Sequence, residues 1–362
     1  MKTRKIALWI AGVAAFLSIP SPSSACTGIS LTTVDGTRVV ARTIEWGGTN
    51  LHSQYVIVPR GYVQQSWLPD GTTGGLKFKS KYGYVGFAVD QKEFIAEGLN
   101  EKGLSAGLFY FPAYGKYPAF EASKASATIV DLQLLAWILG ECATVDDVKA
   151  AIATVNVTSI DPRASTVHWR FTDDSGRQIV LEYIDGKAVF YDNPLGVLTN
   201  SPSFDWQLTN LNNYVNLVPG AAPSQEFGAL ELRPFGAGSG FLGLPGDITP
   251  PSRFVRAAFY QTSAPHYKTT DEAIQEGFQI LRNFDIPIGI ESAKGVTPTD
   301  IPSATQWTAA ADMVNRKLYY TTMYNSAIRC FDLKTIDFGK VKYRTALMDP
   351  IAPQPVHMIT VK

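Results

Sequence analysis

The chain has 362 residues, of which 45% are apolar and 12% aromatic, and its 32 basic residues balance its 32 acidic residues. A chain of this length and apolarity can fill one large core or two ordinary ones. No block of one charge sign and no basic stripe interrupts the sequence, which argues against nucleic acid as a partner. After residue 25, no apolar run approaches the roughly 20 residues that a membrane-spanning helix needs.

Residues 1–25 have the pattern of a secretory signal peptide. A basic start precedes an apolar run over residues 6–19, and small residues follow as far as Ala25. The run has about 14 residues, too few to span a membrane as an anchor. We therefore expect cleavage after Ala25, export to the periplasm or the medium, and a mature chain over residues 26–362 that begins with Cys26.

A lipoprotein signal is the alternative for the same segment. In such signals an aliphatic residue usually occupies the position that Ser23 holds here. Lipidation of Cys26 would block its thiol, and acylation would block its α-amine. The chain would then be a lipid-anchored binding protein without catalytic activity.

Cysteine and histidine are too sparse for a disulfide scaffold or a metal centre. Besides Cys26 the chain has only Cys142 and Cys330, which could pair or could remain free thiols. The four histidines show no metal-ligand spacing: His52, His168, His266 and His357. We expect neither a metal nor a cofactor.

Strands open the mature chain. Residues 26–33 and 38–46 are rich in β-branched side chains, and the Asp35-Gly36 pair between them is a hairpin signal. Cys26 is therefore expected at the start of a strand. Short runs punctuated by glycine and proline predict further strands at 54–59, 84–90, 94–97 and 104–111.

Paired helices then separate groups of strands. Apolar residues at helical spacing predict helices over 129–139 and 144–154, with Thr144 as the N-cap of the second. The remaining expected elements are strands at 167–172, 178–184, 188–191 and 197–199, a long loop over 219–252, helices at 252–261 and 270–283, and strands near 305–313 and 317–323. Grouped strands and paired helices indicate an antiparallel α+β protein, and no linker divides residues 26–362 into more than one domain.

Two motifs typical of other enzymes lie in the wrong context. The run Gly238 to Gly243 fits G-x-G-x-x-G, but no strand precedes it and Pro245 prevents a helix after it. Gly103 to Gly107 fits the G-x-S-x-G elbow of α/β-hydrolases, which requires a helix after the serine. A strand-like run follows instead, so Ser105 is interpreted as an ordinary strand residue.

An N-terminal cysteine combines a nucleophile and a base in one residue. A free thiol has a pKa of about 8.5 and is only slightly ionised near neutral pH, so it needs a base nearby. An α-amine has a pKa of roughly 7.7 to 8.0 and can accept the thiol proton and return it to a leaving amine. Cleavage before Cys26 would therefore create a catalytic centre that needs no histidine.

The sequence resembles the choloylglycine hydrolases, a family of bile salt hydrolases and penicillin V acylases within the N-terminal nucleophile hydrolase superfamily. The resemblance covers nearly the whole mature chain. It rests on five blocks: Cys26-Thr27-Gly28, Arg42-Thr43-Ile44-Glu45-Trp46, Gly98-Leu99-Asn100-Glu101-Lys102-Gly103-Leu104, Leu198-Thr199-Asn200-Ser201-Pro202 and Pro251-Ser252-Arg253-Phe254.

The resemblance implies roles for residues in these blocks. Cys26 corresponds to the nucleophile, Arg42 to the arginine that stabilises its thiolate, and Arg253 to a second active-site arginine. Asn200 corresponds to the side chain of the oxyanion hole. Glu45 stands where the family usually has the aspartate that orients the α-amine, and its extra methylene is a departure from the family pattern.

Two aromatic residues bear on the substrate. Tyr110 occupies the second oxyanion-hole position, to which the family contributes a backbone N–H; bile salt hydrolases usually have asparagine there and penicillin V acylases tyrosine. This residue therefore favours an acylase. Trp46 follows Glu45 directly and is expected to line the pocket for the acyl group.

The resemblance further implies a four-layer αββα fold with two antiparallel sheets between helix layers. It implies hydrolysis of a linear amide through an acyl-thioester intermediate, with a small-molecule N-acyl compound as the substrate. Penicillin V and acyl-homoserine lactones are the expected substrates, and conjugated bile salts are the alternative. A homotetramer is a further possibility that the family suggests.

Overall fold

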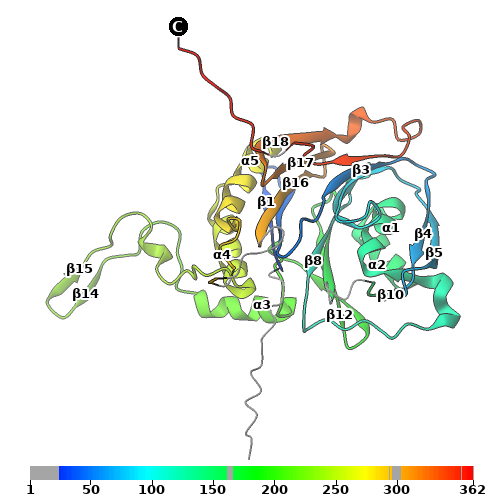
Figure 1. The fold of residues 1–362 in the computed structure, drawn as a ribbon. Helices are drawn as coiled ribbons and strands as arrows, with labels where there is room; N and C mark the ends of the chain where they lie inside the picture. Colours follow the sequence, from blue (N-terminus) through cyan, green and yellow to red (C-terminus); the bar gives the residue numbers. More distant parts are fainter. Residues whose placement is uncertain (1–23, 161–165, 293, 296–302, 352, 362) are drawn as a thin grey trace, which may run out of the picture.

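The computed structural model describes residues 24–160, 166–292, 294–295, 303–351 and 353–361 (Figure 1). Two antiparallel sheets dominate these ranges. Among the helices that they contain, none is both long enough and apolar enough to cross a membrane.

The first sheet combines two strands from the N-terminal part of the described chain with three from its C-terminal part. Its order is β1-β2-β16-β17-β18, and every neighbouring pair is antiparallel. The turn between β1 and β2 contains Gly36 with φ of 87°, a conformation that glycine adopts without steric cost. The strands of this sheet are β1 (Ser24–Thr32), β2 (Arg38–Trp46), β16 (Ala304–Asp312), β17 (Lys317–Thr322) and β18 (Asn325–Asp332).

The second sheet has the order β13-β12-β11-β8-β7-β6-β3-β19 and is also antiparallel throughout. The sequence signals identified most of its strands, but β19 was not expected. Its strands are β3 (Gln54–Val58), β6 (Tyr84–Ala88), β7 (Ile95–Asn100), β8 (Ser105–Tyr110), β11 (Val167–Thr172), β12 (Gln178–Ile184), β13 (Lys187–Asp192) and β19 (Arg344–Leu347).

Helices cover the outer face of each sheet. On the first sheet, α4 (Pro250–Ser263) and α5 (Thr270–Leu281) contact β1, β2 and β16. On the second, α1 (Leu134–Glu141) and α2 (Val145–Ile152) contact strands that include β7, β8 and β11. The sheets face each other through β1 with β8 and β16 with β7, which confirms the expected αββα layers (Figure 1).

Two expectations for the first helix pair had different outcomes. Thr144 caps α2 as expected: its Oγ1 accepts from the Asp147 N–H at 3.1 Å, and the Asp147 carboxylate accepts from the Thr144 N–H. The expected helix start at residue 129 is wrong, because residues 128–130 form a strand, β9, that pairs in parallel with β10 (Asn156–Thr158). The β-branched residues of this strand suit that pairing, and α1 begins only at Leu134.

The sequence signals missed several smaller elements. Residues 197–199 are not a strand but form a single bridge, between Leu198 and Gly28. The long glycine-rich loop carries a hairpin that extends away from the layers (Figure 1). The remaining elements are β4 (Val63–Trp67), β5 (Thr73–Lys79), β9 (Thr128–Val130), β10 (Asn156–Thr158), α3 (Phe204–Asn210), β14 (Gln225–Phe227) and β15 (Leu230–Leu232).

Candidate active site

Cys26 lies in β1, where it directly follows Ala25. The antiparallel register places Cys26 opposite Ile44, Gly28 opposite Arg42 and Ala25 opposite Glu45. Side chains of a strand alternate between its two faces, so Cys26 and Arg42 share one face and Glu45 points to the other. Contacts support this: Arg42 reaches the second sheet, whereas Glu45 interacts with Arg253 of α4.

Cys26 is only 3% exposed. Burial raises its pKa, and the carboxylate of Glu45 acts in the same direction; the charges of Arg42 and Arg253 and a hydrogen bond from the Tyr110 backbone N–H oppose these effects. The thiol is therefore held in its protonated, weakly nucleophilic form while Ala25 precedes it.

Asn200 connects Cys26 to the second sheet. Its Oδ1 accepts from the Cys26 backbone N–H at 2.9 Å, and its Nδ2 donates to the Tyr110 carbonyl oxygen at 2.7 Å. A carboxamide nitrogen carries two hydrogens, so one remains for a further acceptor. This hydrogen and the Tyr110 N–H both lie beside Cys26, which is the arrangement that an oxyanion hole requires.

Arg253 reaches the site from the second turn of α4. This helix begins with Pro250 and Pro251, whose fixed φ suits the first turn. The Arg253 guanidinium donates through Nη1 to the Cys26 carbonyl and to Thr27 Oγ1, the latter at 2.8 Å, and through Nη2 to Asn200 Oδ1 at 2.6 Å. A single buried cation thus fixes both the Cys26 main chain and the Asn200 amide.

Arg42 lies on the other side of Cys26, between the two sheets. Its Nη2 donates to the Leu108 carbonyl at 3.0 Å, and its guanidinium lies 4.4 Å from the ring centroid of Phe109. The ring of Trp307 lies 5.1 Å away. Cation–π contacts on two rings hold the charge in place, and the Arg42 charge lowers the pKa of the Cys26 thiol.

Glu45 is 1% exposed and accepts a hydrogen bond from Thr305 Oγ1 at 3.1 Å. Burial raises its pKa to about 7, although Arg253, a hydrogen bond with Thr43 and Arg42 all lower it. The carboxyl group therefore titrates near neutral pH, where an adjacent α-amine also titrates.

This titration predicts a pH dependence of stability for the chain that retains Ala25. The unfolded chain releases the Glu45 proton near pH 4.5 and the folded chain near pH 7, so stability should fall by roughly 3 kcal/mol as the pH rises between these values. The Glu45→Gln variant should lack this component. Urea unfolding of both proteins at pH 5 and 7.5 would measure it, and identical pH dependence in the two would contradict the assignment.

The two aromatic residues predicted near the substrate lie together. Tyr110 ends β8 and Trp46 ends β2, and their rings make an edge contact with centroids 5.8 Å apart. Neither side chain is fully buried. They form an aromatic wall beside Cys26 at the point where both strands end.

All seven residues predicted for the site are thus brought together by β1, β2, β8, α4 and the segment that follows residue 199. The sequence reasoning did not assign roles to Thr27, which contacts Arg253, or to Thr305, which contacts Glu45. Thr27 lies within the Cys26 block, so its position was a usable signal; Thr305 had none. Cys142 and Cys330 are free thiols, so the open question of their pairing is resolved.

Comparison with known proteins identifies the family of the chain. Residues 26–345 match the family model described as linear amide C–N hydrolases, choloylglycine hydrolase family. The chain is 32% identical to a bile salt hydrolase/transferase of Clostridium perfringens over 331 residues, covering 88% of this chain and 95% of that protein. It is 28% identical to a penicillin V acylase of Pectobacterium atrosepticum over 332 residues, covering 83% of this chain and 78% of that protein.

Solved structures show the same fold. A variant of conjugated bile acid hydrolase from Clostridium perfringens superimposes with a TM-score of 0.76 at 28% identity, covering 92% of this chain and all of that one. Penicillin V acylase from Agrobacterium tumefaciens gives 0.72 at 23% identity, covering 91% and 95% of the two chains. The layers are therefore those of the N-terminal nucleophile hydrolases, and the chain belongs to the choloylglycine hydrolase family, whose members hydrolyse linear amide C–N bonds.

Proposed function

We propose that this protein is an exported amidase that becomes active when cleavage after Ala25 makes Cys26 N-terminal. The observation that carries the proposal is the set of contacts around the Cys26 nitrogen. That nitrogen already donates to Asn200 Oδ1, next to the Arg253 guanidinium. Cleavage would convert it into an α-amine in place, with no rearrangement of the surrounding side chains.

Cleavage also changes the environment of the thiol. Ser24 and Ala25 pair with Trp46 and Glu45 on β2 in the unprocessed chain. Their removal opens the end of β1 beside the aromatic wall of Trp46 and Tyr110 and admits water to Cys26. The desolvation that raises the thiol pKa is then relieved.

The proposed reaction has two halves. The α-amine takes the Cys26 proton while the sulfur attacks the amide carbon, and the oxyanion accepts hydrogen bonds from the Tyr110 N–H and Asn200 Nδ2. The amine then protonates the leaving nitrogen, the C–N bond breaks, and an acyl-thioester remains on Cys26. Water attacks this thioester, which releases the carboxylate and restores the thiol.

Penicillin V and acyl-homoserine lactones are the proposed substrates. Both have an apolar acyl group joined to a small polar amine by a linear amide. The edge-on rings of Trp46 and Tyr110 suit such an acyl group. The penicillin V acylase of Pectobacterium atrosepticum is one of the relatives that supports this choice.

Conjugated bile salts are the second candidate class. The higher identity to the bile salt hydrolase/transferase of Clostridium perfringens favours them, at 32% against 28%. Tyr110 argues the other way, because the resemblance places tyrosine at this position in penicillin V acylases and asparagine in bile salt hydrolases.

A hydrolysis panel separates these candidates. Penicillin V, a long-chain acyl-homoserine lactone and glycocholate would be incubated at equal concentration with the mature enzyme, and the released amines would be quantified. We expect kcat/KM for one of the first two to exceed that for glycocholate by about tenfold or more, the effect of about 1.4 kcal/mol in the transition state. A preference for glycocholate would contradict the acylase assignment, and cleavage of none would contradict the proposed function.

A further inference from the structure

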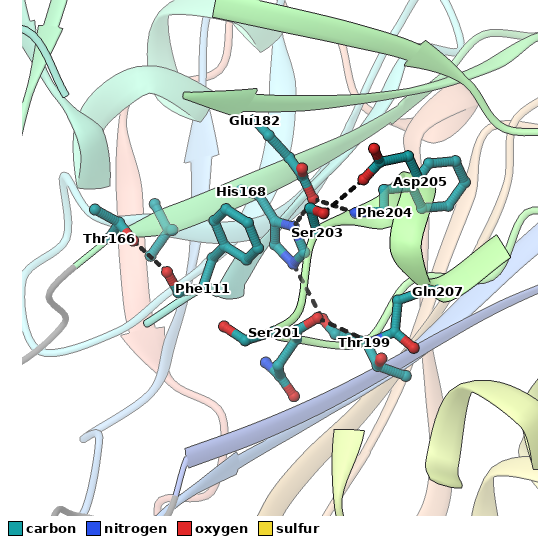
Figure 2. Close-up of polar contacts among 12 residues, drawn as sticks. Phe111, Thr166, His168, Glu182, Thr199, Ser201, Ser203, Phe204, Asp205 and Gln207 are labelled. Atoms are coloured by element: carbon teal, nitrogen blue, oxygen red, sulfur yellow. Dashed lines mark hydrogen bonds and ion pairs between the residues drawn. The ribbon is translucent and has the colours of Figure 1, made fainter. Parts of the chain in front are cut away.

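A buried polar pair lies next to the active site but outside it. His168 of β11 and Glu182 of β12 are both 0% exposed, and His168 Nδ1 lies 3.0 Å from Glu182 Oε1 (Figure 2). The imidazole stacks on the ring of Phe111, with centroids 4.5 Å apart and an angle of 8° between the planes. None of the proposed chemical steps uses either residue.

The pair holds both ends of the segment that contains Asn200. His168 Nε2 lies 3.1 Å from the carbonyl oxygen of Thr199, the residue directly before Asn200. At the other end, the Phe204 N–H at the start of α3 donates to Glu182 Oε1 at 3.0 Å. Figure 2 shows the imidazole between Glu182 and Thr199, with Phe204 on the same carboxylate.

The protonation pattern of the pair follows from these partners. A carbonyl oxygen only accepts, so His168 Nε2 carries a hydrogen and donates it to Thr199. His168 Nδ1 and Glu182 Oε1 are in hydrogen-bond contact, so one proton lies between them, on the nitrogen or on the oxygen. The ring is therefore fixed in orientation by Glu182 and by Phe111, and its Nε2–H has a single direction.

Burying a polar pair of this kind costs free energy that an apolar core would not. Two polar side chains that are completely removed from water lose their hydration, and apolar residues of similar volume often stabilise a protein equally well. The Thr199 carbonyl needs a hydrogen-bond donor because it is buried. Many groups could donate, and the fixed imidazole of His168 does so in one defined direction. What the pair adds to ordinary packing is precise placement of the main chain at residues 199–204.

We propose that His168 is a positioning residue for Asn200 and acts through the Thr199 carbonyl, with Glu182 as the group that orients the imidazole. The inference rests on the proposed function, in which Asn200 donates to the oxyanion. The hydrogen bond to the Thr199 carbonyl fixes the position of the peptide that joins Thr199 to Asn200. A displacement of the Asn200 side-chain amide by about an ångström weakens oxyanion stabilisation steeply.

Three variants isolate this contact. In Glu182→Gln the carboxamide nitrogen, in the place of Oε1, can donate to His168 Nδ1, so the imidazole keeps its Nε2–H on Thr199, whereas the Phe204 N–H, which also contacts Oε1, loses its acceptor. The double variant H168F/E182Q retains the ring stack on Phe111 and leaves no unpaired carboxylate, but it lacks the donor to Thr199. Tyr117→Phe is the stability control, because the Tyr117 hydroxyl bonds the backbone of Val167, the neighbour of His168.

The expected result is a specific loss of kcat. Relative to Glu182→Gln, the double variant should lose about 10- to 100-fold in kcat with KM within about threefold, less than deletion of an oxyanion donor would cost. Modification of Cys26 by methyl methanethiosulfonate forms no oxyanion and should proceed at the same rate in both. Tyr117→Phe should lower the melting temperature while leaving kcat unchanged.

A crystal structure of the double variant provides a readout that does not depend on activity. We expect the contact of 2.9 Å between the Cys26 nitrogen and Asn200 Oδ1 to lengthen or disappear. Unchanged Asn200 contacts, or equal kcat in Glu182→Gln and H168F/E182Q, would overturn the inference. A wild-type enzyme that cleaves no N-acyl compound would refute the proposed function alone, since the position of Asn200 would still decide the role of His168.

Discussion

Replacement of Cys26 by serine is expected to lower the rate of amide cleavage by a factor on the order of 10⁴ to 10⁶ while the fold is retained. The two side chains differ by one atom, oxygen in place of sulfur, so packing changes little. A hydroxyl, however, is far less acidic and less nucleophilic than a thiol, so the same α-amine takes its proton much less readily near neutral pH.

The measurement is kcat/KM on the best substrate of the panel, with thermal unfolding to verify the fold. Cys330→Ser is the matched control, because this thiol is exposed and free and should be dispensable for activity. Intact masses of both variants should correspond to residues 26–362. Full activity in Cys26→Ser would contradict the proposed nucleophile, and a lipid adduct on Cys26 of the wild type would support the lipid-anchored alternative.

Conversion of Asn200 to aspartate should reduce kcat by roughly 100- to 1,000-fold or more. Aspartate has the same shape and keeps an oxygen for the Cys26 nitrogen and for Arg253, so the contacts of Asn200 Oδ1 survive. What it loses is the N–H donor, and it adds a negative charge beside the developing oxyanion. Transition-state stabilisation therefore falls, and the lost contact between Nδ2 and the Tyr110 carbonyl adds to the effect.

Steady-state kinetics with the same substrate would measure this loss. Asn212→Asp, an exposed position in the segment after α3, controls for the added charge and should leave kcat unaltered. If Asn200→Asp retained more than about a tenth of wild-type kcat, Asn200 could not be the oxyanion donor.

Short-range signals in the sequence predicted much of the secondary structure. The Asp35-Gly36 turn sets the register of β1 and β2, and the Thr144 cap begins α2 where expected. These features depend on neighbours along the chain, so residue types alone carry the information. The start of α1 was wrong because residues 128–130 pair with β10, a partner 28 positions further along the chain.

The chemistry of the site was also visible in the sequence, but its geometry was not. An N-terminal cysteine implies its own base, and the five blocks of the resemblance supplied the partner residues. Which partner touches which atom depends on contacts such as Asn200 to Cys26, 174 positions apart, and Arg253 to Cys26, 227 positions apart. No local pattern encodes distances of that kind.

By itself, then, the sequence predicted most strands of the two sheets and the helices that cover them, and it indicated the class of reaction, whereas Cys26 as the nucleophile stays a prediction. Only the tertiary structure decided that Glu45 points away from Arg42 and titrates near pH 7, since that depends on strand faces and on burial. The structure also revealed His168 and Glu182, which nothing in the sequence distinguished from core residues. Folding removes water from His168 and Glu182 and brings the Thr199 carbonyl within hydrogen-bond distance of the imidazole. Because hydrogen bonds are stronger in such a dry interior, the pair can hold the main chain beside Cys26.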